Sequence, residues 1–94
     1  MRLWVIAYDI ADDRRRRQLV KCLASQMQRV QESVFEGWLM QKELNDLINQ
    51  AKPILNLEED QLRAYPLAVR SEKRYGVYGQ QRATTKQTDY WIIG

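Results

Sequence analysis

Residues 3–13 read LWVIAYDIADD, and this stretch decides the fold. Six apolar residues come first and occupy both alternating faces, which is typical of a central strand covered on both sides. Asp9 ends the apolar run. The pair Asp12-Asp13 follows and can cap a helix, because its carboxylates accept from free N–H groups at a helix start. The stretch therefore predicts a strand that leads directly into a helix.

The rest of the chain predicts further strands and one more helix. The clearest helical signal places Leu44, Leu47, Ile48 and Ala51 at i, i+3, i+4 and i+7. The order β-α-β-β-α-β is that of the α+β class with a ferredoxin-like fold, in which one antiparallel sheet carries two helices on one face. The predicted elements are a strand at 2–10, a helix at 12–27, strands at 29–32 and 34–39 joined by a kink, bulge or very tight turn near Ser33, a helix at 41–51 ended by Pro53, and a strand at 62–69.

The C-terminal quarter, residues 70–94, has a different character. Residues 75–79 predict a short strand, residues 80–87 are polar, and residues 88–93 (TDYWII) predict a strong strand. A single small sheet has little room for that last strand, so we expect it to pack on the sheet edge of a partner subunit or to be exchanged with it. The chain is thus predicted to be one domain, 1–94, with a core at 1–69, that forms a homodimer.

Composition narrows the possible chemistry. The 94 residues include one cysteine and no histidine, with 15 basic and 12 acidic side chains for a net charge of +3. Triads with histidine, zinc held by nitrogen and sulfur ligands within one subunit, and an internal disulfide are therefore excluded. Any metal site must use oxygen ligands, which favours Mg²⁺, Mn²⁺ or Ca²⁺.

No stretch of the sequence resembles a membrane span. The longest apolar runs are far shorter than the roughly 20 residues that cross a bilayer. The first of them is ended by Asp9, so it is also too short for the core of a secretory signal. We expect a cytoplasmic protein without a membrane partner.

Asp9 is the first candidate site residue, because a carboxylate stands where an apolar strand meets a helix start. The alternative is a turn or capping residue, a role it would share with Asp12 and Asp13. Mg²⁺ often takes only one or two carboxylates together with phosphate oxygens and water. One Asp9 alone is a poor site, and a two-fold dimer that brings both copies together would supply the second ligand.

Four consecutive arginines at residues 14–17 form the second candidate feature. At helical spacing they cannot all face one way, so some of them point to solvent. Arg14 and Arg17 share a face with Lys21, which predicts either a solvated helix surface or a surface that binds phosphates. Arg16 lies one turn ahead of the apolar stripe, and we expect it to reach inward toward a site.

Several other side chains have both a structural and a functional interpretation. Phe35, the only phenylalanine, is either a core residue or a stacking surface for an unpaired base. Ser33 is either a kink residue or a hydrogen-bond donor. Cys22 is predicted to be a small apolar residue of the first helix, and Tyr8 a core or interface residue.

Two blocks of sequence carry a resemblance to a known family. Residues 8–16 read YDIADDRRR and residues 29–37 read RVQESVFEG, and a Tyr-Pro-Leu follows at 65–67. Over about residues 1–69 the chain resembles the Cas-two (Cas2) family of small CRISPR-associated proteins, described as endoribonucleases that act in spacer acquisition.

The resemblance implies a ferredoxin-like homodimer in which the two copies of Asp9 face each other and associate with a metal, Mg²⁺ or Mn²⁺. It implies cleavage of single-stranded RNA or double-stranded DNA, with Asp9 as the catalytic residue. It also implies a CRISPR integrase and nucleic acid as partners. The further residues of the implied site region are Tyr8, Arg16, Arg29, Ser33 and Phe35.

Two functions remain open, and a third is disfavoured. The first is a metal-dependent endonuclease in which Arg16 and Arg29 neutralise developing charge. The alternative is a non-catalytic dimeric scaffold that binds nucleic acid through Arg14, Arg16 and Arg17 and the basic C-terminal quarter, with an affinity that falls steeply with salt. A small-molecule regulatory module on the same fold is disfavoured by the arginine run and the two matched blocks.

Overall fold

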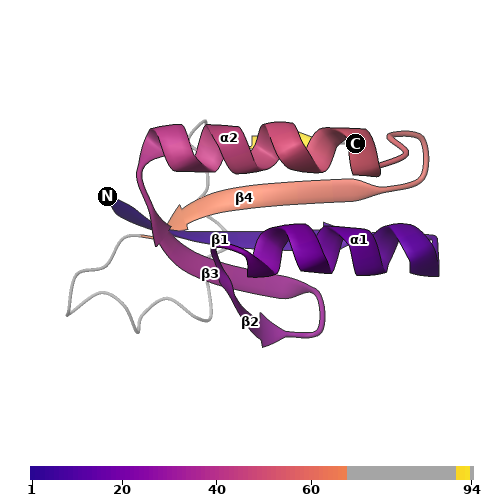
Figure 1. Cartoon of the computed structure of the whole chain (residues 1–94), viewed down its shortest axis with the longest axis horizontal. Helices are drawn as coiled ribbons and strands as arrows, with labels where there is room; N and C mark the ends of the chain where they lie inside the picture. Colours follow the sequence, from indigo (N-terminus) through magenta and orange to yellow (C-terminus); the bar gives the residue numbers. More distant parts are fainter. Residues whose placement is uncertain (68–90, 94) are drawn as a thin grey trace, which may run out of the picture.

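The computed structural model describes residues 1–67 and 91–93 of the chain. Within them one antiparallel sheet has the strand order β2-β3-β1-β4-β5, and two helices lie over it (Figure 1). The predicted α+β, ferredoxin-like fold is confirmed, while the strand predicted at 75–79 and residues 88–90 lie outside the described residues. The elements are β1 (Arg2–Asp9), α1 (Asp13–Ala24), β2 (Gln28–Gln31), β3 (Val34–Leu39), α2 (Gln41–Ala51), the 3-10 turn η1 (Lys52–Ile54), β4 (Gln61–Leu67) and β5 (Trp91–Ile93).

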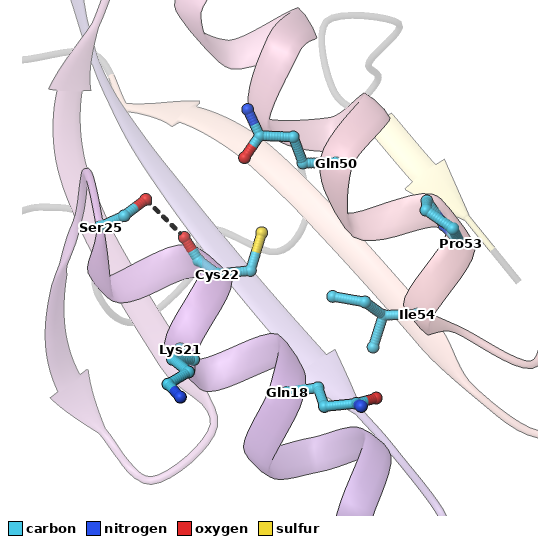
Figure 2. Close-up of a pocket in the computed structure, with 7 residues that line it drawn as sticks. All are labelled: Gln18, Lys21, Cys22, Ser25, Gln50, Pro53 and Ile54. Atoms are coloured by element: carbon cyan, nitrogen blue, oxygen red, sulfur yellow. Dashed lines mark hydrogen bonds between the residues drawn. The ribbon is translucent and has the colours of Figure 1, made fainter.

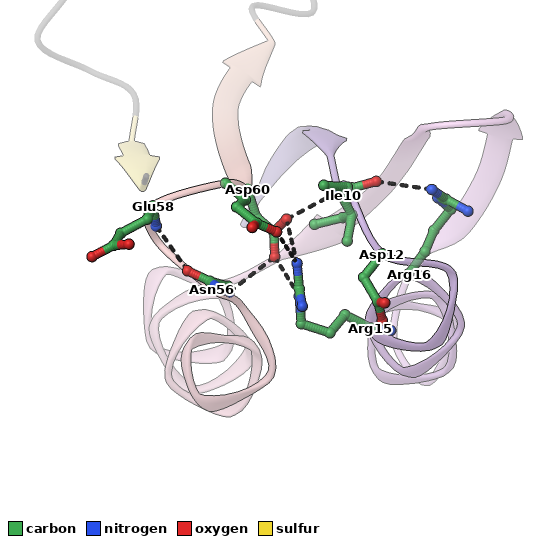
Figure 3. A network of polar contacts seen from close by, with 9 residues as sticks. Ile10, Asp12, Arg15, Arg16, Asn56, Glu58 and Asp60 are labelled. Carbon is green, nitrogen blue, oxygen red and sulfur yellow. Dashed lines mark hydrogen bonds and ion pairs between the residues drawn. The ribbon is translucent and has the colours of Figure 1, made fainter.

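The central strand β1 has two unlike faces. Trp4, Ile6 and Tyr8 are buried in the core with the helices, as period-two alternation requires. The residues between them are only partly buried, so the prediction of a strand covered on both faces is wrong for the described chain. Within the described residues the second face carries no helix, because both α1 and α2 pack on the same side of the sheet (Figure 3). We call this second surface the open face.

The two helices contact each other and close the core. Leu19 and Leu23 of α1 are fully buried, and α2 buries the four apolar residues that its spacing predicted. Helix α1 ends at Ala24, three residues before the predicted end, and Met27 enters the core from the loop that follows. None of the helices in the described ranges is long and apolar enough to cross a membrane.

Strands β2 and β3 form a hairpin closed by a two-residue turn at Glu32 and Ser33. The register shifts between Arg29 and Gln31, and Val30 between them is 46% exposed. A bulge of this kind increases local twist and re-aims neighbouring side chains. The predicted irregularity near Ser33 is therefore confirmed as a tight turn with a bulge three residues before it.

Strand β5 pairs antiparallel with β4 of the same chain, with Ile93 opposite Leu62 and Trp91 opposite Ala64. The reasoning that a single small sheet has little room for the last strand is therefore wrong, because β4 offers it an edge. Exchange of this strand with a partner subunit stays a prediction.

Candidate functional site around Asp9

Asp9 is the last residue of β1 and lies opposite Gln61 of β4. Its side chain is exposed, and because Tyr8 points into the core, alternation places Asp9 on the open face. Within residues 1–67 and 91–93 we find no hydrogen bond or ion pair to the Asp9 carboxylate. The same part of the chain contains no group of three or more acidic, histidine or cysteine side chains able to hold a metal ion.

Arg16 reaches back along the loop that follows Asp9. Its Nη2 donates to the carbonyl oxygen of Ile10 at 2.9 Å, and its Nη1 pairs with the Asp13 carboxylate. Ile10 is itself buried, at 4% exposure. Arg16 thus reaches inward, as expected, to a backbone contact one residue after Asp9, and its part in a site stays a prediction.

Arg15, which the sequence did not single out, makes the most buried ion pair of the arginine run within the described residues. Its Nε donates to Oδ2 of Asp60 at 2.8 Å and its Nη2 to Oδ1 at 3.2 Å, while Nη2 also reaches Glu59 at 3.0 Å (Figure 3). The Asp60 side chain is completely buried. The guanidinium of Arg15, with the N–H groups of Asn56 and Ala11, lowers the pKa of Asp60 to about 2.

Tyr8 and Arg29 meet at the carbonyl of Glu32. The Tyr8 hydroxyl donates to this oxygen at 2.9 Å, and Nη2 of Arg29 donates to it at 2.7 Å. Burial raises the pKa of Tyr8, although the charges of Arg29 and Arg16 partly oppose the shift. Tyr8 is therefore a protonated phenol at neutral pH. Ser33 takes part through its backbone, whose carbonyl accepts from the N–H of Tyr8 at 3.1 Å.

Phe35 is a core residue. It is 1% exposed, and its ring centroid lies 6.2 Å from that of Tyr8 at an interplanar angle of 32°. A base cannot stack on a ring that solvent does not reach, so the interpretation of Phe35 as a stacking surface is wrong and the structural one is confirmed.

Arg14 and Arg17 are exposed on α1 together with Lys21. No hydrogen bond or ion pair engages the side chains of Arg14 and Arg17 in the described part of the chain. This face of α1 therefore presents guanidinium groups to solvent, as a phosphate-binding surface requires.

A groove between α1 and α2 lies away from Asp9, at the C-terminal end of α1 (Figure 2). Cys22 opens onto it, and burial raises the pKa of its thiol, which keeps it protonated and unreactive. This agrees with the predicted role of a small apolar residue. The groove contains no carboxylate and is lined by Gln18, Lys21, Cys22, Ser25, Gln50, Pro53 and Ile54.

Folding thus brings most of the predicted site residues to one end of the sheet. Asp9 follows Tyr8 directly, and the charges of Arg16 and Arg29 both act on the Tyr8 hydroxyl. Chemically, this end of the sheet offers a carboxylate that has no partner among the described residues, on the open face, and two cations around the Tyr8 hydroxyl. Such groups are suited to holding a divalent cation and a phosphate.

Comparison with known proteins matches residues 1–75 to a family model described as CRISPR associated protein Cas2. A CRISPR-associated endoribonuclease Cas2 of Synechocystis is 48% identical over 80 residues, covering 84% of this chain and 86% of the relative. A CRISPR-associated endonuclease Cas2 of Thermus thermophilus is 49% identical over 67 residues, covering 71% of this chain and 74% of the relative. The crystal structure of a hypothetical protein from Thermus thermophilus, 48% identical, superposes with a TM-score of 0.70 and covers 72% of this chain and 83% of its own.

Proposed function

Because this chain belongs to the Cas2 family of CRISPR-associated proteins, we propose that it is a metal-dependent endonuclease acting in spacer acquisition. Its substrate is single-stranded RNA or double-stranded DNA. The observation that carries the proposal is the exposed Asp9 carboxylate, which has no partner in the described chain. It stands at the end of β1, one residue before the Ile10 carbonyl that Arg16 binds, while Arg29 binds the β2–β3 turn that Tyr8 also contacts. Relatives named endoribonuclease and endonuclease support hydrolysis of a phosphodiester.

The donor chemistry at Asp9 fits Mg²⁺ or Mn²⁺, since both prefer carboxylate and phosphate oxygens. One carboxylate does not complete such a site, and the described residues offer no cluster of three ligands. We therefore assign the second carboxylate to Asp9 of a second copy of the chain, and the remaining ligands to substrate phosphate and water. A bound divalent cation would polarise the phosphate and make an attacking water more acidic.

Arg16 and Arg29 hold the substrate phosphate near Asp9. Arg29 is exposed and uses Nε and Nη2 to bind the carbonyls of Gln31 and Glu32. These bonds fix the plane of the guanidinium, and we assign its positive charge to a phosphate oxygen of the substrate. A positive group positioned in advance stabilises the charge that develops on the phosphate during cleavage.

The open face supports the homodimer that this site needs. The partly buried Leu3 and Val5 lie on this face. Trp38 and Leu67, which pair with Leu3 on the two neighbouring strands, share it and are 53% and 41% exposed. Apolar side chains gathered on one sheet face are typical of a protein interface. A two-fold axis through this face would bring together the same residues of both subunits, and Asp9 lies at its edge.

The second candidate function is a non-catalytic dimeric scaffold that holds DNA for a CRISPR integrase. Arg14 and Arg17 favour it. They are exposed and have no side-chain partner in the part of the chain that the structure describes, so they suit contact with duplex phosphates whether or not Asp9 performs chemistry. The two functions are compatible in one protein, and cleavage separates them.

The experiment measures cleavage of labelled single-stranded RNA and double-stranded DNA with Mg²⁺, Mn²⁺ or a chelator. Wild type is compared with Asp9→Asn and with Asp46→Asn, a control that removes an exposed carboxylate from α2. We expect metal-dependent cleavage by wild type and Asp46→Asn only. Equal cleavage by Asp9→Asn would refute the Asp9 site, and no cleavage with retained, salt-sensitive DNA binding would leave the scaffold function. Gel filtration confirms that each protein is a folded dimer.

A further inference from the structure

The loop between β1 and α1 is held at each of the three residues that follow Asp9. The carbonyl of Ile10 accepts from Arg16 at 2.9 Å, and the N–H of Ala11 donates to Oδ1 of Asp60 at 2.9 Å. Asp12 caps α1 by accepting from the N–H of Arg15 at 2.9 Å. A loop fixed at consecutive residues leaves the backbone of Asp9 little freedom, since β1 holds it on the other side.

Asp60 is the centre of this arrangement. Its two carboxylate oxygens accept from the N–H of Ala11, the N–H of Asn56 at 2.9 Å, and two nitrogens of Arg15 (Figure 3). These donors come from three separate segments of the chain. Gln61, the next residue, lies opposite Asp9 in the β1–β4 ladder. Asp60 therefore joins the end of β1, the start of α1 and the start of β4 at the point where Asp9 emerges.

We propose that Asp60, paired with Arg15, is a positioning residue that fixes the loop after Asp9 and so sets the direction of the Asp9 carboxylate toward the metal. The claim that Asp9 is directed toward a metal rests on the proposed function. The claim that Asp60 fixes the loop rests on the hydrogen bonds alone. Asp60 touches neither substrate nor metal, because it is buried on the helix side of the strand ends.

The pair needs both members for a physical reason. A buried carboxylate without its cation is strongly unfavourable, and the cation without the carboxylate loses two directed hydrogen bonds. Asparagine at position 60 has one acceptor oxygen and turns an NH₂ group toward other donors. At least one of the N–H groups that Asp60 now satisfies then loses its acceptor, and the loop loosens.

The test titrates Mn²⁺ into the full-length dimer without substrate and follows paramagnetic broadening of the NMR signals around Asp9. Exchange of the Ala11 amide hydrogen is measured in the same samples. The variants are Asp60→Asn and the milder Arg15→Lys, which keeps the charge but not the two-nitrogen contact. The control Ile48→Val removes a methyl group from the core of α2 and lowers stability without touching the loop.

We expect Asp60→Asn to raise the Mn²⁺ concentration for half-saturation by about tenfold or more, as loss of a group supporting a metal ligand does. The Mn²⁺ concentration for half-saturation of Arg15→Lys should lie between the values of Asp60→Asn and wild type. Exchange of the Ala11 amide hydrogen should be fastest in Asp60→Asn, slower in Arg15→Lys and slowest in wild type. Ile48→Val should leave the half-saturation unchanged. Because folded protein alone is titrated, a loss of stability by itself does not move this value, and Arg15→Lys gives the answer if Asp60→Asn does not fold.

The proposal would be overturned if folded Asp60→Asn or Arg15→Lys reached half-saturation at the same Mn²⁺ concentration as wild type. It would also be overturned if wild type bound no Mn²⁺ near Asp9. Cleavage is assayed in parallel and separates the two claims. If wild type binds Mn²⁺ without cleaving, and the variants bind it more weakly, the nuclease function fails and the positioning role stands.

Discussion

The hydroxyl of Tyr8 donates a hydrogen bond to the main-chain carbonyl of Glu32 at 2.9 Å, 24 residues further along the chain. This bond ties the end of β1 to the β2–β3 turn, one residue before Asp9. Arg29 donates to the same carbonyl, so the oxygen keeps a partner if the hydroxyl is removed. The phenol therefore has a structural role, and its raised pKa keeps its proton in place at neutral pH.

Tyr8→Phe tests this role. Removing one hydrogen bond whose acceptor stays satisfied should lower the free energy of unfolding by about 1 kcal/mol. Metal-dependent cleavage should change by less than about threefold, since a group with a firmly held proton does not act as a base. Urea unfolding and single-turnover cleavage measure the two effects. A loss of about a hundredfold or more in cleavage by folded Tyr8→Phe would assign Tyr8 to the chemistry instead.

Phe35→Leu separates core packing from nucleic-acid stacking. Because the ring is buried, we expect a loss of about 1–2 kcal/mol in unfolding free energy and no change in the affinity of the folded protein for single-stranded RNA. Fluorescence anisotropy with labelled RNA in chelator measures the affinity. A clear drop in RNA affinity without a drop in folded fraction would show that the ring reaches the bases.

The exposed arginines of α1 should govern the salt dependence of DNA binding. The double variant Arg14→Gln/Arg17→Gln should weaken duplex binding at all sequences alike and reduce the salt slope by about 1 for each phosphate that an arginine no longer neutralises. The charge-matched control Lys42→Gln/Lys52→Gln changes exposed residues in and just after α2. If the control lowers the slope as much as the arginine variant, net charge rather than this face of α1 explains the binding.

Acid should weaken the fold through Asp60. Its pKa is lowered from 3.8 to about 2 in the folded state, so the stability it contributes is complete above pH 4 and lost as the pH falls toward 2. Arg15 is the charged group that contacts it, and it also pairs with Glu59. Arg15 stays charged throughout this range. In urea unfolding between pH 5 and 2, Asp60→Asn should show a shallower decline than wild type. Ile48→Val, which keeps the Arg15–Asp60 pair, should show the same decline as wild type. Parallel curves for wild type and Asp60→Asn would contradict the assignment.

The sequence predicted what local patterns determine. The strand that ends at Asp9, the helix that Asp12 caps and the stripe of α2 each follow from residues close in the chain. The Arg15–Asp60 pair joins positions 45 residues apart, and Asp60 closes an acidic run that resembles a solvated connection. Its one sequence signal is its place just before a strand, which becomes informative only once β4 is known to pair with β1.

The site was predicted less completely than the fold, because it depends more on contacts between residues far apart in the chain. The inward direction of Arg16 could be predicted because its distance from the apolar stripe of α1 is a local property. Phe35 was ambiguous because a lone aromatic residue in a strand does not reveal which face it occupies, and the register with Ile6 decides that it faces the core. The two faces of β1 differ for a reason that no local pattern contains, namely that both helices pack on one side.

The claim that two copies of Asp9 share one metal site is tested most directly with mixed dimers. Wild-type and Asp9→Asn chains are refolded together in known proportions, and the rate of metal-dependent cleavage is measured. If each site needs both carboxylates, an equal mixture keeps about one quarter of the wild-type rate, because only that share of dimers has two intact chains. A rate of about one half, falling in proportion to the wild-type fraction, would show that each chain acts alone and would contradict the shared site.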